Sequence, residues 1–392
     1  MDRLLETQDL VTNFYTYEGV VQALNQVSLV VAHGTTFGLV GESGCGKSVT
    51  VRSIMRIVPE PGRIEGGRVI AFLDEESREK GVDLLLQSEA YMQGLRGCDI
   101  SMIFQEPNAA LNPTLSIGDQ VAESFLFHRQ EEMCRQVLED LDRPGDRTMA
   151  PFKAFLRYIF TLAMARPDSL TLKAIDHTPV LRRWRGRLKR EALRRSVEIL
   201  GRLGLPNPDQ VVGMYPHNLS GGMKQRIVIA MALACSPVLL IADEATSNLD
   251  VTIQAQILDL LRRLKEEVIS SILLITHDLG VVAETCDRVG VMYAGNVCEV
   301  ADVDRLFRRP LHPYTKALLD SVPKFSMEGT LRSIEGNVPN LVEPPPGCRF
   351  HPRCPERRAA CVEKRPPLLE IEPDHFVACY LYPGSEAPEG PA

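Results

Sequence analysis

The stretch GESGCGKS at residues 41–48 constrains this chain more than any other feature. It fits G-x-x-x-x-G-K-[ST], a loop in which backbone N–H groups surround phosphates, a lysine reaches the terminal phosphates and a hydroxyl holds Mg²⁺. A short apolar run at 37–40 precedes the loop, and apolar residues at helical spacing follow it over 49–57. The sequence therefore predicts a strand, loop and helix that bind a nucleotide, with its phosphates at the helix N-terminus.

Length and composition narrow the class of protein. A chain of 392 residues is too long for one simple core and predicts two or three domains. The formal net charge of −7 argues against a nucleic-acid binder that works through a basic field. The longest apolar candidate, 227–242, is interrupted by Ser236-Pro237, which favours a helix and a strand over a membrane span. The first residues have no basic region followed by an apolar one, so we expect no signal peptide.

Further candidate motifs for nucleotide chemistry follow the loop at 41–48 along the chain. A predicted strand at 99–104 ends at Gln105, whose carbonyl could coordinate Mg²⁺ or orient water, although an isolated glutamine there would be ordinary surface. An apolar run at 238–242 ends in Asp243 and Glu244, and two adjacent acids supply one carboxylate for Mg²⁺ and one for the attacking water. The remaining motifs are LSGGMKQR at 219–226, SNLD at 247–250 and ITHD at 275–278.

With these motifs in this order, the chain resembles the nucleotide-binding subunit of an ABC transporter over nearly all of its length. The resemblance implies an α/β fold: a RecA-like P-loop ATPase core with an N-terminal antiparallel β portion, an inserted helical subdomain and a small C-terminal cysteine-containing domain. It places the ATPase core at 1–105 and 223–300, the helical subdomain at 106–222 and the C-terminal domain at 301–392. We expect the tail from 383 onward to be disordered.

The resemblance also implies which residues hold Mg·ATP. Ser48 and Gln105 would ligate Mg²⁺, and Asp243 would hold it through water. Apart from the resemblance, Phe14, Tyr15 and Tyr17 lie ahead of the loop, where an aromatic side chain could stack on adenine; Tyr15 is the candidate, and a buried strand aromatic is the competing interpretation. The residues that surround the phosphates would be Gly41, Ser43, Gly44, Cys45, Gly46 and Lys47.

The same resemblance assigns the hydrolytic step and the dimer contacts. Glu244 would polarise the attacking water, and His277 would contact the γ-phosphate. Ser220 and Gly222 would bind the γ-phosphate of the nucleotide on a partner subunit, since a hydroxyl, N–H groups and a helix N-terminus suit that charge. Asp250 would align the two subunits.

Several stretches are similar to the oligopeptide/dipeptide importer subfamily. They are GESGCGKSVT at 41–50, FQEPNAALNPTLSIGDQ at 104–120, DVTIQAQILDLL at 250–261, HPYTKALL at 312–319 and GCRFHPRCP at 347–355. This resemblance implies ATP-driven uptake of di- or oligopeptides through two transmembrane permeases, with a homologous second ATPase, an extracytoplasmic binding protein acting indirectly, and no nucleic acid. The chain would lie on the cytoplasmic face of the membrane. The alternatives are another solute, such as nickel or a sugar, or a soluble ABC ATPase outside transport.

An insertion at about 135–195 departs from the usual pattern of the family. It contains an apolar helical stretch, Phe152 to Met164, and a basic one, Arg182 to Arg195, with the single tryptophan. A basic amphipathic segment can lie on an anionic membrane surface. The alternative, which we favour, is an extra helical hairpin with a solvated arginine-rich face.

Four of the ten cysteines gather near the C-terminus with the spacing C-x5-C-x6-C-x17-C. Without an export signal, such a cluster indicates a metal site before disulfides. The thiolates could close a tetrahedral zinc site or hold a four-iron cluster, and the C-x2-C pairs of zinc ribbons are absent. The resemblance implies a [4Fe–4S] cluster, and zinc or unligated thiols are the alternatives. The four residues are Cys348, Cys354, Cys361 and Cys379.

Overall fold

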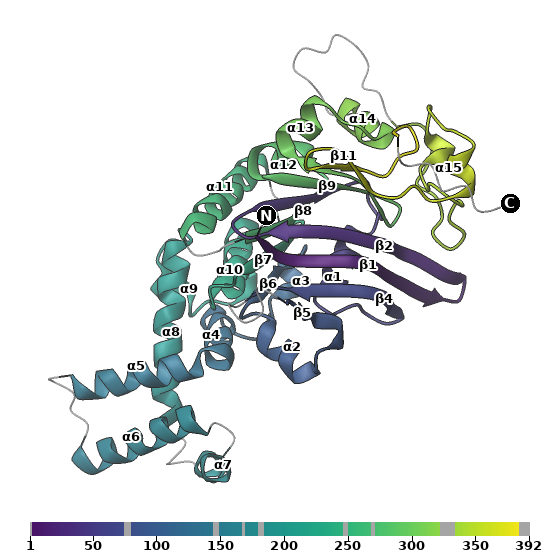
Figure 1. The fold of residues 1–392 in the computed structure, drawn as a ribbon. Helices are drawn as coiled ribbons and strands as arrows, with labels where there is room; N and C mark the ends of the chain where they lie inside the picture. Colours follow the sequence, from purple (N-terminus) through teal and green to yellow (C-terminus); the bar gives the residue numbers. More distant parts are fainter. Residues whose placement is uncertain are drawn as a thin grey trace. The chain divides into compact units, whose positions relative to one another are not determined.

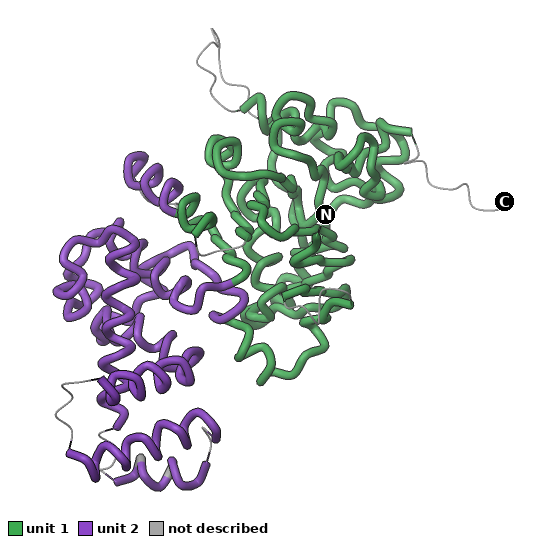
Figure 2. Tube along the Cα trace, turned by 60° about the vertical axis from the view of Figure 1, so that its left-hand side comes forward, with its two compact units in different colours: residues 1–96, 238–247, 261–392 green, residues 97–237, 248–260 purple. Residues whose placement is uncertain are grey.

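The computed structural model describes residues 2–73, 80–143, 149–166, 169–178, 184–245, 250–267, 271–321 and 334–383. The chain divides into two compact units (Figure 2): unit 1 comprises residues 1–96, 238–247 and 261–392, and unit 2 comprises 97–237 and 248–260. Residues 384–392 of the expected disordered tail, residues 247–249 of the SNLD motif and residues 182–183 of the basic stretch lie outside the described residues.

Unit 1 begins with an antiparallel sheet of order β2-β1-β4-β5 (Figure 1). A two-residue turn joins the first pair, so Thr16 is paired with Gly19. Apolar residues that face the core, among them Leu5, Leu10 and Val27, are fully buried, as expected for a sheet with one covered face. The sequence prediction of an N-terminal antiparallel β portion is confirmed. The strands are β1 (Arg3–Thr16), β2 (Gly19–Ala32), β4 (Gly62–Ala71) and β5 (Val82–Asp83).

A second, mixed sheet carries the nucleotide motifs of unit 1. Its strands there have the order β11-β12-β10-β9-β3-β8-β7. Strand β3 runs parallel to β8 and β9, and β7 runs parallel to β8, whereas β10, β11 and β12 are antiparallel to their neighbours. The strands are β3 (Thr36–Val40), β7 (Leu239–Asp243), β8 (Ser271–Ile275), β9 (Arg288–Tyr293), β10 (Asn296–Asp302), β11 (Leu369–Glu372) and β12 (His375–Val377).

Every residue of β3, β7 and β8 is buried, which explains why these segments appear in the sequence as continuous apolar runs. Because the three strands are parallel, their carboxyl ends meet at one edge of the sheet, the edge at which ligands bind in α/β folds. The loop at 41–48, the acids at 243–244 and the segment at 276–277 follow these ends directly.

Short helices complete unit 1. One longer helix, α11 (Val251–Glu267), has residues in both units. The other helices are α1 (Lys47–Ile54), η1 (Leu84–Leu86), α2 (Glu89–Leu95), α12 (Leu279–Thr285), α13 (Val303–Arg308), α14 (Pro313–Asp320), η4 (His351–Arg353) and α15 (Ala360–Glu363).

Unit 2 is mainly helical. Helix α4 packs on α8, and α5 packs on both α6 and α8. Besides the short strand β6 (Ile100–Ile103), its elements are α3 (Pro107–Ala110), α4 (Ile117–His128), α5 (Gln130–Asp142), α6 (Ala150–Ala165), α7 (Leu170–His177), α8 (Trp184–Arg202), α9 (Pro208–Val211), η3 (Pro216–Asn218) and α10 (Gly221–Leu233).

The insertion forms helices that pack on each other through buried aromatic residues and ion pairs. Phe160 of α6 meets Trp184 of α8 edge to face, with ring centroids 5.6 Å apart. Burial alone would raise the pKa of Glu191, but hydrogen bonds from Arg194 and Arg195 lower it. Part of the arginine-rich stretch therefore stabilises the helices themselves.

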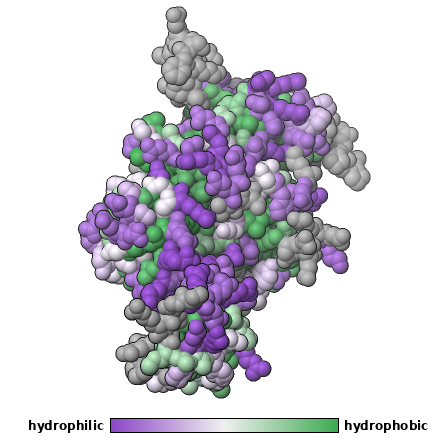
Figure 3. Space-filling view, turned by 90° about the vertical axis from the view of Figure 1, so that its left-hand side faces the viewer, coloured by the Kyte–Doolittle hydropathy of each residue, from purple (hydrophilic) through white to green (hydrophobic). Residues whose placement is uncertain are grey.

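Apolar side chains also stand exposed on this region, on α6 and α7 and just ahead of α6, among them Met149, Tyr158 and Leu170. In the space-filling view, green residues lie among purple ones at the lower end, where α6 and α7 lie (Figure 3). None of the described helices is both long enough and apolar enough to span a bilayer.

Candidate nucleotide-binding site

The loop at 41–48 joins β3 to α1 and requires glycine at two points. Gly41 has φ 152°, and a Cβ there would lie 2.1 Å from the carbonyl oxygen of Met292. Gly46 precedes α1 with φ 104°, in the left-handed region that favours glycine. These two positions therefore explain the glycines of the motif, and the predicted strand, loop and helix are present.

Lys47 lies inside this loop and is only 5% exposed. Its Nζ donates hydrogen bonds to the carbonyl oxygens of Gly41, at 2.7 Å, and Glu42, at 3.0 Å. Cys45 Sγ lies 3.6 Å from the same nitrogen, and burial raises the pKa of this thiol. The ammonium group is thus held where a lysine can reach phosphates that the loop surrounds.

Ser48 in the first turn of α1 meets Asp243, the last residue of β7. Ser48 Oγ donates a hydrogen bond to Asp243 Oδ1 at 2.8 Å. Asp243 is 1% exposed, and this burial raises the pKa of its carboxyl group because a buried negative charge is poorly solvated. A hydroxyl beside such a carboxylate is a donor set that Mg²⁺ prefers.

Glu244 and His277 are also neighbours, from the ends of β7 and β8. His277 Nδ1 lies 3.4 Å from Glu244 Oε1, and the imidazole is largely exposed. Glu244 has φ 49°, a conformation that is unusual for a residue other than glycine, and its N–H donates to the carbonyl oxygen of Ile275 at 3.0 Å. Such backbone strain is found at functional sites, where surrounding contacts hold it in place.

Four further predicted site residues belong to unit 2. Ser220 caps α10 by accepting a hydrogen bond from the N–H of Met223 at 3.4 Å, and both Ser220 and the next glycine are exposed. A Cβ on Gly222 would lie 3.1 Å from Ile253 Cγ2. Asp250 Oδ1 accepts from the N–H of Ile253 at 2.9 Å, ahead of α11. Gln105 is exposed and follows β6.

Tyr15 lies near the end of β1 and is about 43% exposed. Its hydroxyl donates to Glu65 Oε1 at 2.8 Å, and the guanidinium of Arg63 lies over its ring, 5.4 Å from the centroid. These contacts do not test adenine stacking by Tyr15, which stays a prediction.

Sequence reasoning missed the contacts of Glu42, the second residue of the loop. Its N–H donates to the hydroxyl of Tyr314 at 2.9 Å, and its carboxylate accepts two hydrogen bonds from Arg353, at 2.8 and 3.2 Å. The signals available were a carboxylate inside a phosphate-binding loop and an arginine within GCRFHPRCP. Neither signal indicates that the two residues meet.

The four C-terminal cysteines are free thiols, and Cys348 is near enough to the other three to interact with them electrostatically. Burial is the main cause that raises the pKa of Cys348 to about 12 and that of Cys379 to about 11, and the charges of the other thiols of the group contribute to both values. Burial likewise raises the pKa of Cys354, followed by the charge of Cys361. Within the described part of the chain, no three His, Cys, Asp or Glu side chains are grouped so as to hold a metal ion.

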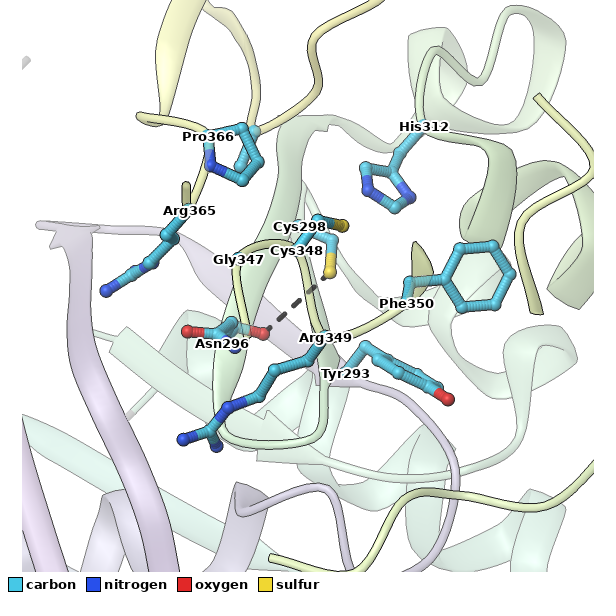
Figure 4. Close-up of a pocket in the computed structure, with 11 residues that line it drawn as sticks. Tyr293, Asn296, Cys298, His312, Gly347, Cys348, Arg349, Phe350, Arg365 and Pro366 are labelled. Atoms are coloured by element: carbon cyan, nitrogen blue, oxygen red, sulfur yellow. Dashed lines mark hydrogen bonds between the residues drawn. The ribbon is translucent and has the colours of Figure 1, made fainter. Parts of the chain in front are cut away.

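A small cavity of about 20 Å³ lies beside Cys348 (Figure 4), with room for about one water molecule. Cys298 lines it and lies 4.0 Å from the carbonyl oxygen of Asn296. Burial raises the pKa of Cys298, and the neighbouring Cys348 and Cys45 raise it further. Sequence spacing did not indicate this fifth cysteine, because it lies on β10, well before the other four.

The parallel strands, the loop around Lys47, and the paired Ser48 and Asp243 define a P-loop nucleotide-binding protein of the ATPase class. The family model described as ABC transporter matches residues 24–247, and the model described as oligopeptide/dipeptide transporter, C-terminal region, matches residues 298–361. The chain therefore belongs to the ABC transporter family and is an ATPase of that type.

Relatives of known name match almost the whole chain. The dipeptide transport ATP-binding protein DppD of Bacillus subtilis (strain 168) is 41% identical over 383 residues, which are 97% of this chain and 95% of the relative. The oligopeptide transport ATP-binding protein AppD of the same organism is 40% identical over 97% of this chain and 98% of its own length. These matches confirm the resemblance predicted from the motifs.

Among solved structures, the dimeric structure of MJ0796, a bacterial ABC transporter cassette, has a TM-score of 0.53 at 21% identity and covers 76% of this chain and 98% of that one. This likeness concerns the fold alone. It confirms the predicted RecA-like ABC fold class.

Proposed function

We propose that this chain is the ATP-hydrolysing subunit of an importer that takes up di- or oligopeptides through separate transmembrane permeases. The observation that carries the proposal is the C-terminal region at 298–361, which lies outside the shared ATPase core and matches the oligopeptide/dipeptide transporter model. The names of the relatives DppD and AppD, as dipeptide and oligopeptide transport ATP-binding proteins, support it.

Within this function, the residues of unit 1 receive specific roles. Lys47 and the loop amides would bind the β- and γ-phosphates, and Ser48 and Asp243 would hold Mg²⁺, which would neutralise phosphate charge. Glu244 would polarise the attacking water, and His277 beside it would contact the γ-phosphate. The short distance between these last two side chains supports their assignment to the same step.

The residues of unit 2 would supply a further Mg²⁺ ligand and the contacts to a second ATPase subunit. Gln105 would add a Mg²⁺ ligand. Ser220 and Gly222, at the exposed N-terminus of α10, would bind the nucleotide of a second, homologous ABC ATPase, and Asp250 would align that partner. We further propose two permeases, an extracytoplasmic binding protein that acts indirectly, and a position on the cytoplasmic face of the membrane. The predicted boundaries of the ATPase core, the helical subdomain and the C-terminal domain are part of the same proposal.

The cysteine group fits a [4Fe–4S] cluster by the chemistry of its donors. All four donors are thiols, and burial raises the pKa of Cys348, Cys354 and Cys379, so bound iron, which favours the thiolate form, would offset the cost of burying these groups as thiolates. Among the described residues no three His, Cys, Asp or Glu side chains are placed to hold a metal ion, so the proposal rests on the four thiols and their spacing in the sequence. We propose Cys348, Cys354, Cys361 and Cys379 as its ligands; bound, the cluster would supply a one-electron redox centre and cross-link these loops.

Metal analysis after anaerobic purification tests the cluster. We expect about four iron and four sulfide per chain with broad visible absorbance. The variant Cys354→Ser should lose this iron, whereas Cys98→Ser, a cysteine of unit 2, should keep it. One zinc per chain would instead support a zinc site, and four thiols that all react with an alkylating reagent would show that the cysteines bind no metal.

Uptake by cells tests the importer. We expect a strain of the source organism that lacks this gene to take up radiolabelled di- and tripeptides at a small fraction of the normal rate, and a plasmid copy of the gene to restore uptake. Nickel and sugar uptake are the matched controls and should not change. Normal peptide uptake with a loss of nickel or sugar uptake would reassign the solute, and no change in any of them would remove the transport role.

A further inference from the structure

Glu42 of the phosphate-binding loop is held from outside the ATPase motifs. Its N–H and its carboxylate are bound by Tyr314 of α14 and Arg353 of η4, both in the C-terminal region of unit 1. Its carbonyl oxygen accepts the hydrogen bond from Lys47 Nζ at 3.0 Å. The peptide groups on both sides of Glu42 therefore connect the C-terminal region to the lysine of the loop.

Every hydrogen-bond donor of the Arg353 side chain is paired. Its side chain is 6% exposed, and all five N–H donors of the guanidinium have acceptors. Two go to the Glu42 carboxylate as a fork, one goes to the hydroxyl of Tyr293, and the other two go to backbone carbonyl oxygens of residues 334 and 335. A bidentate pair of this kind fixes orientation as well as distance, which a lysine could not do.

Aromatic packing holds both partners in place. The rings of Tyr293 and Tyr314 have centroids 4.7 Å apart, and Phe350 lies 5.1 Å from Tyr293 and 5.3 Å from Tyr314. All three are nearly inaccessible to solvent. Tyr293 and Phe350 line the cavity in Figure 4. The guanidinium of Arg353 lies 5.7 Å from the ring centroid of Tyr293. Tyr293 is the last residue of β9, which pairs with β3 in the sheet. The sheet therefore fixes the position of one of the groups that bind Arg353.

We propose that Arg353 and Tyr314 are positioning residues for nucleotide binding. They hold Glu42, and through it the loop and Lys47, in the conformation that receives the phosphates, without touching the nucleotide themselves. The C-terminal region thereby becomes a determinant of ATP affinity in addition to its place in the importer. The proposal rests on the assignment of residues 41–48 as the ATP site.

A mutational cycle on the ion pair tests this inference. The variants are Arg353→Met, Glu42→Gln and the double variant, and the measurement is the Kd for ATP together with kcat and KM. We expect each single variant to raise the Kd roughly 5- to 30-fold, with a smaller change in kcat, and the double variant to be no weaker than either single one. Arg353→Lys should recover only part of the affinity, since it keeps the charge but loses the fork.

A control and a second measurement separate positioning from general stability. Arg365→Met removes another arginine of the C-terminal region, one whose hydrogen bonds go to Gln26 of β2 and not to Glu42, and it should leave the Kd for ATP unchanged. Hydrogen exchange of the peptide over 41–48 should accelerate in Arg353→Met but not in Arg365→Met. Tyr314→Phe keeps the ring and deletes only the acceptor for Glu42, so it carries the test if Arg353→Met fails to fold.

Three results would contradict the positioning role of Arg353 and Tyr314. An unchanged Kd in folded Arg353→Met and Tyr314→Phe, strictly additive losses in the double variant, or an equal loss in Arg365→Met would each overturn the positioning role. Lys47→Met in the same assay tests whether residues 41–48 bind ATP at all. Unchanged binding in this variant would contradict the ATP site itself, and not only the positioning role.

Discussion

We expect Glu244→Gln to lower the rate of ATP hydrolysis by roughly 10²- to 10⁴-fold while ATP still binds, since this is the usual contribution of a general base. The amide keeps the shape of the side chain and its place beside His277 but cannot accept a proton from water. The measurements are steady-state phosphate release and the Kd for ATP. Because ATP would persist, the variant should also form more ATP-dependent dimer in sedimentation than the wild type.

Glu284→Gln is the matched control, because this glutamate is exposed on α12 and lies outside the site. It should keep the normal rate. Full activity in Glu244→Gln would remove Glu244 from the chemistry, and a loss of ATP binding in that variant would show that its role is in the binding step instead.

Lys47→Met should weaken ATP binding by roughly 30- to 1,000-fold, which corresponds to the loss of charge-assisted hydrogen bonds to phosphate. Methionine has a similar length and suits the buried position, so the charge is the main change. The Kd for ATP, measured by titration calorimetry, checks this expectation. Thermal unfolding measured alongside shows whether the loop survives the loss of hydrogen bonds to Gly41 and Glu42.

The control for this variant is Lys189→Met, which removes a lysine that pairs with Asp119 in unit 2, at 2.6 Å. Its Kd for ATP should equal that of the wild type. Near-normal binding by folded Lys47→Met would contradict the assignment of residues 41–48 as the phosphate-binding loop.

Much of the ATPase core could be predicted from the sequence because its signals are local. The glycines of the loop occupy positions that only glycine fills without strain, so their spacing alone indicates the turn at 41–46. The buried strands before Lys47 and before Asp243 are continuous apolar runs, and parallel strands bring their ends together, so the contact between Ser48 and Asp243 follows from topology.

The rest depends on tertiary contacts that leave no local signal. Glu42 and Arg353 are 311 positions apart, and nothing in either neighbourhood indicates the other. The left-handed backbone of Glu244 is equally hidden, because its residue type does not favour that conformation. Cys298 of β10 and Cys348 line the same cavity although they are far apart in the sequence, so no local pattern indicates that they meet.

Coupling of hydrolysis to uptake tests the central claim most directly. The measurement is ATP hydrolysis and labelled dipeptide uptake together, in proteoliposomes that contain this chain with its co-purified permeases, second ATPase and binding protein. We predict that peptide stimulates ATP hydrolysis, that uptake requires Mg·ATP, and that Glu244→Gln in this chain strongly reduces both. Uptake that proceeds at the normal rate with Glu244→Gln, or hydrolysis that is indifferent to peptide, would contradict the account.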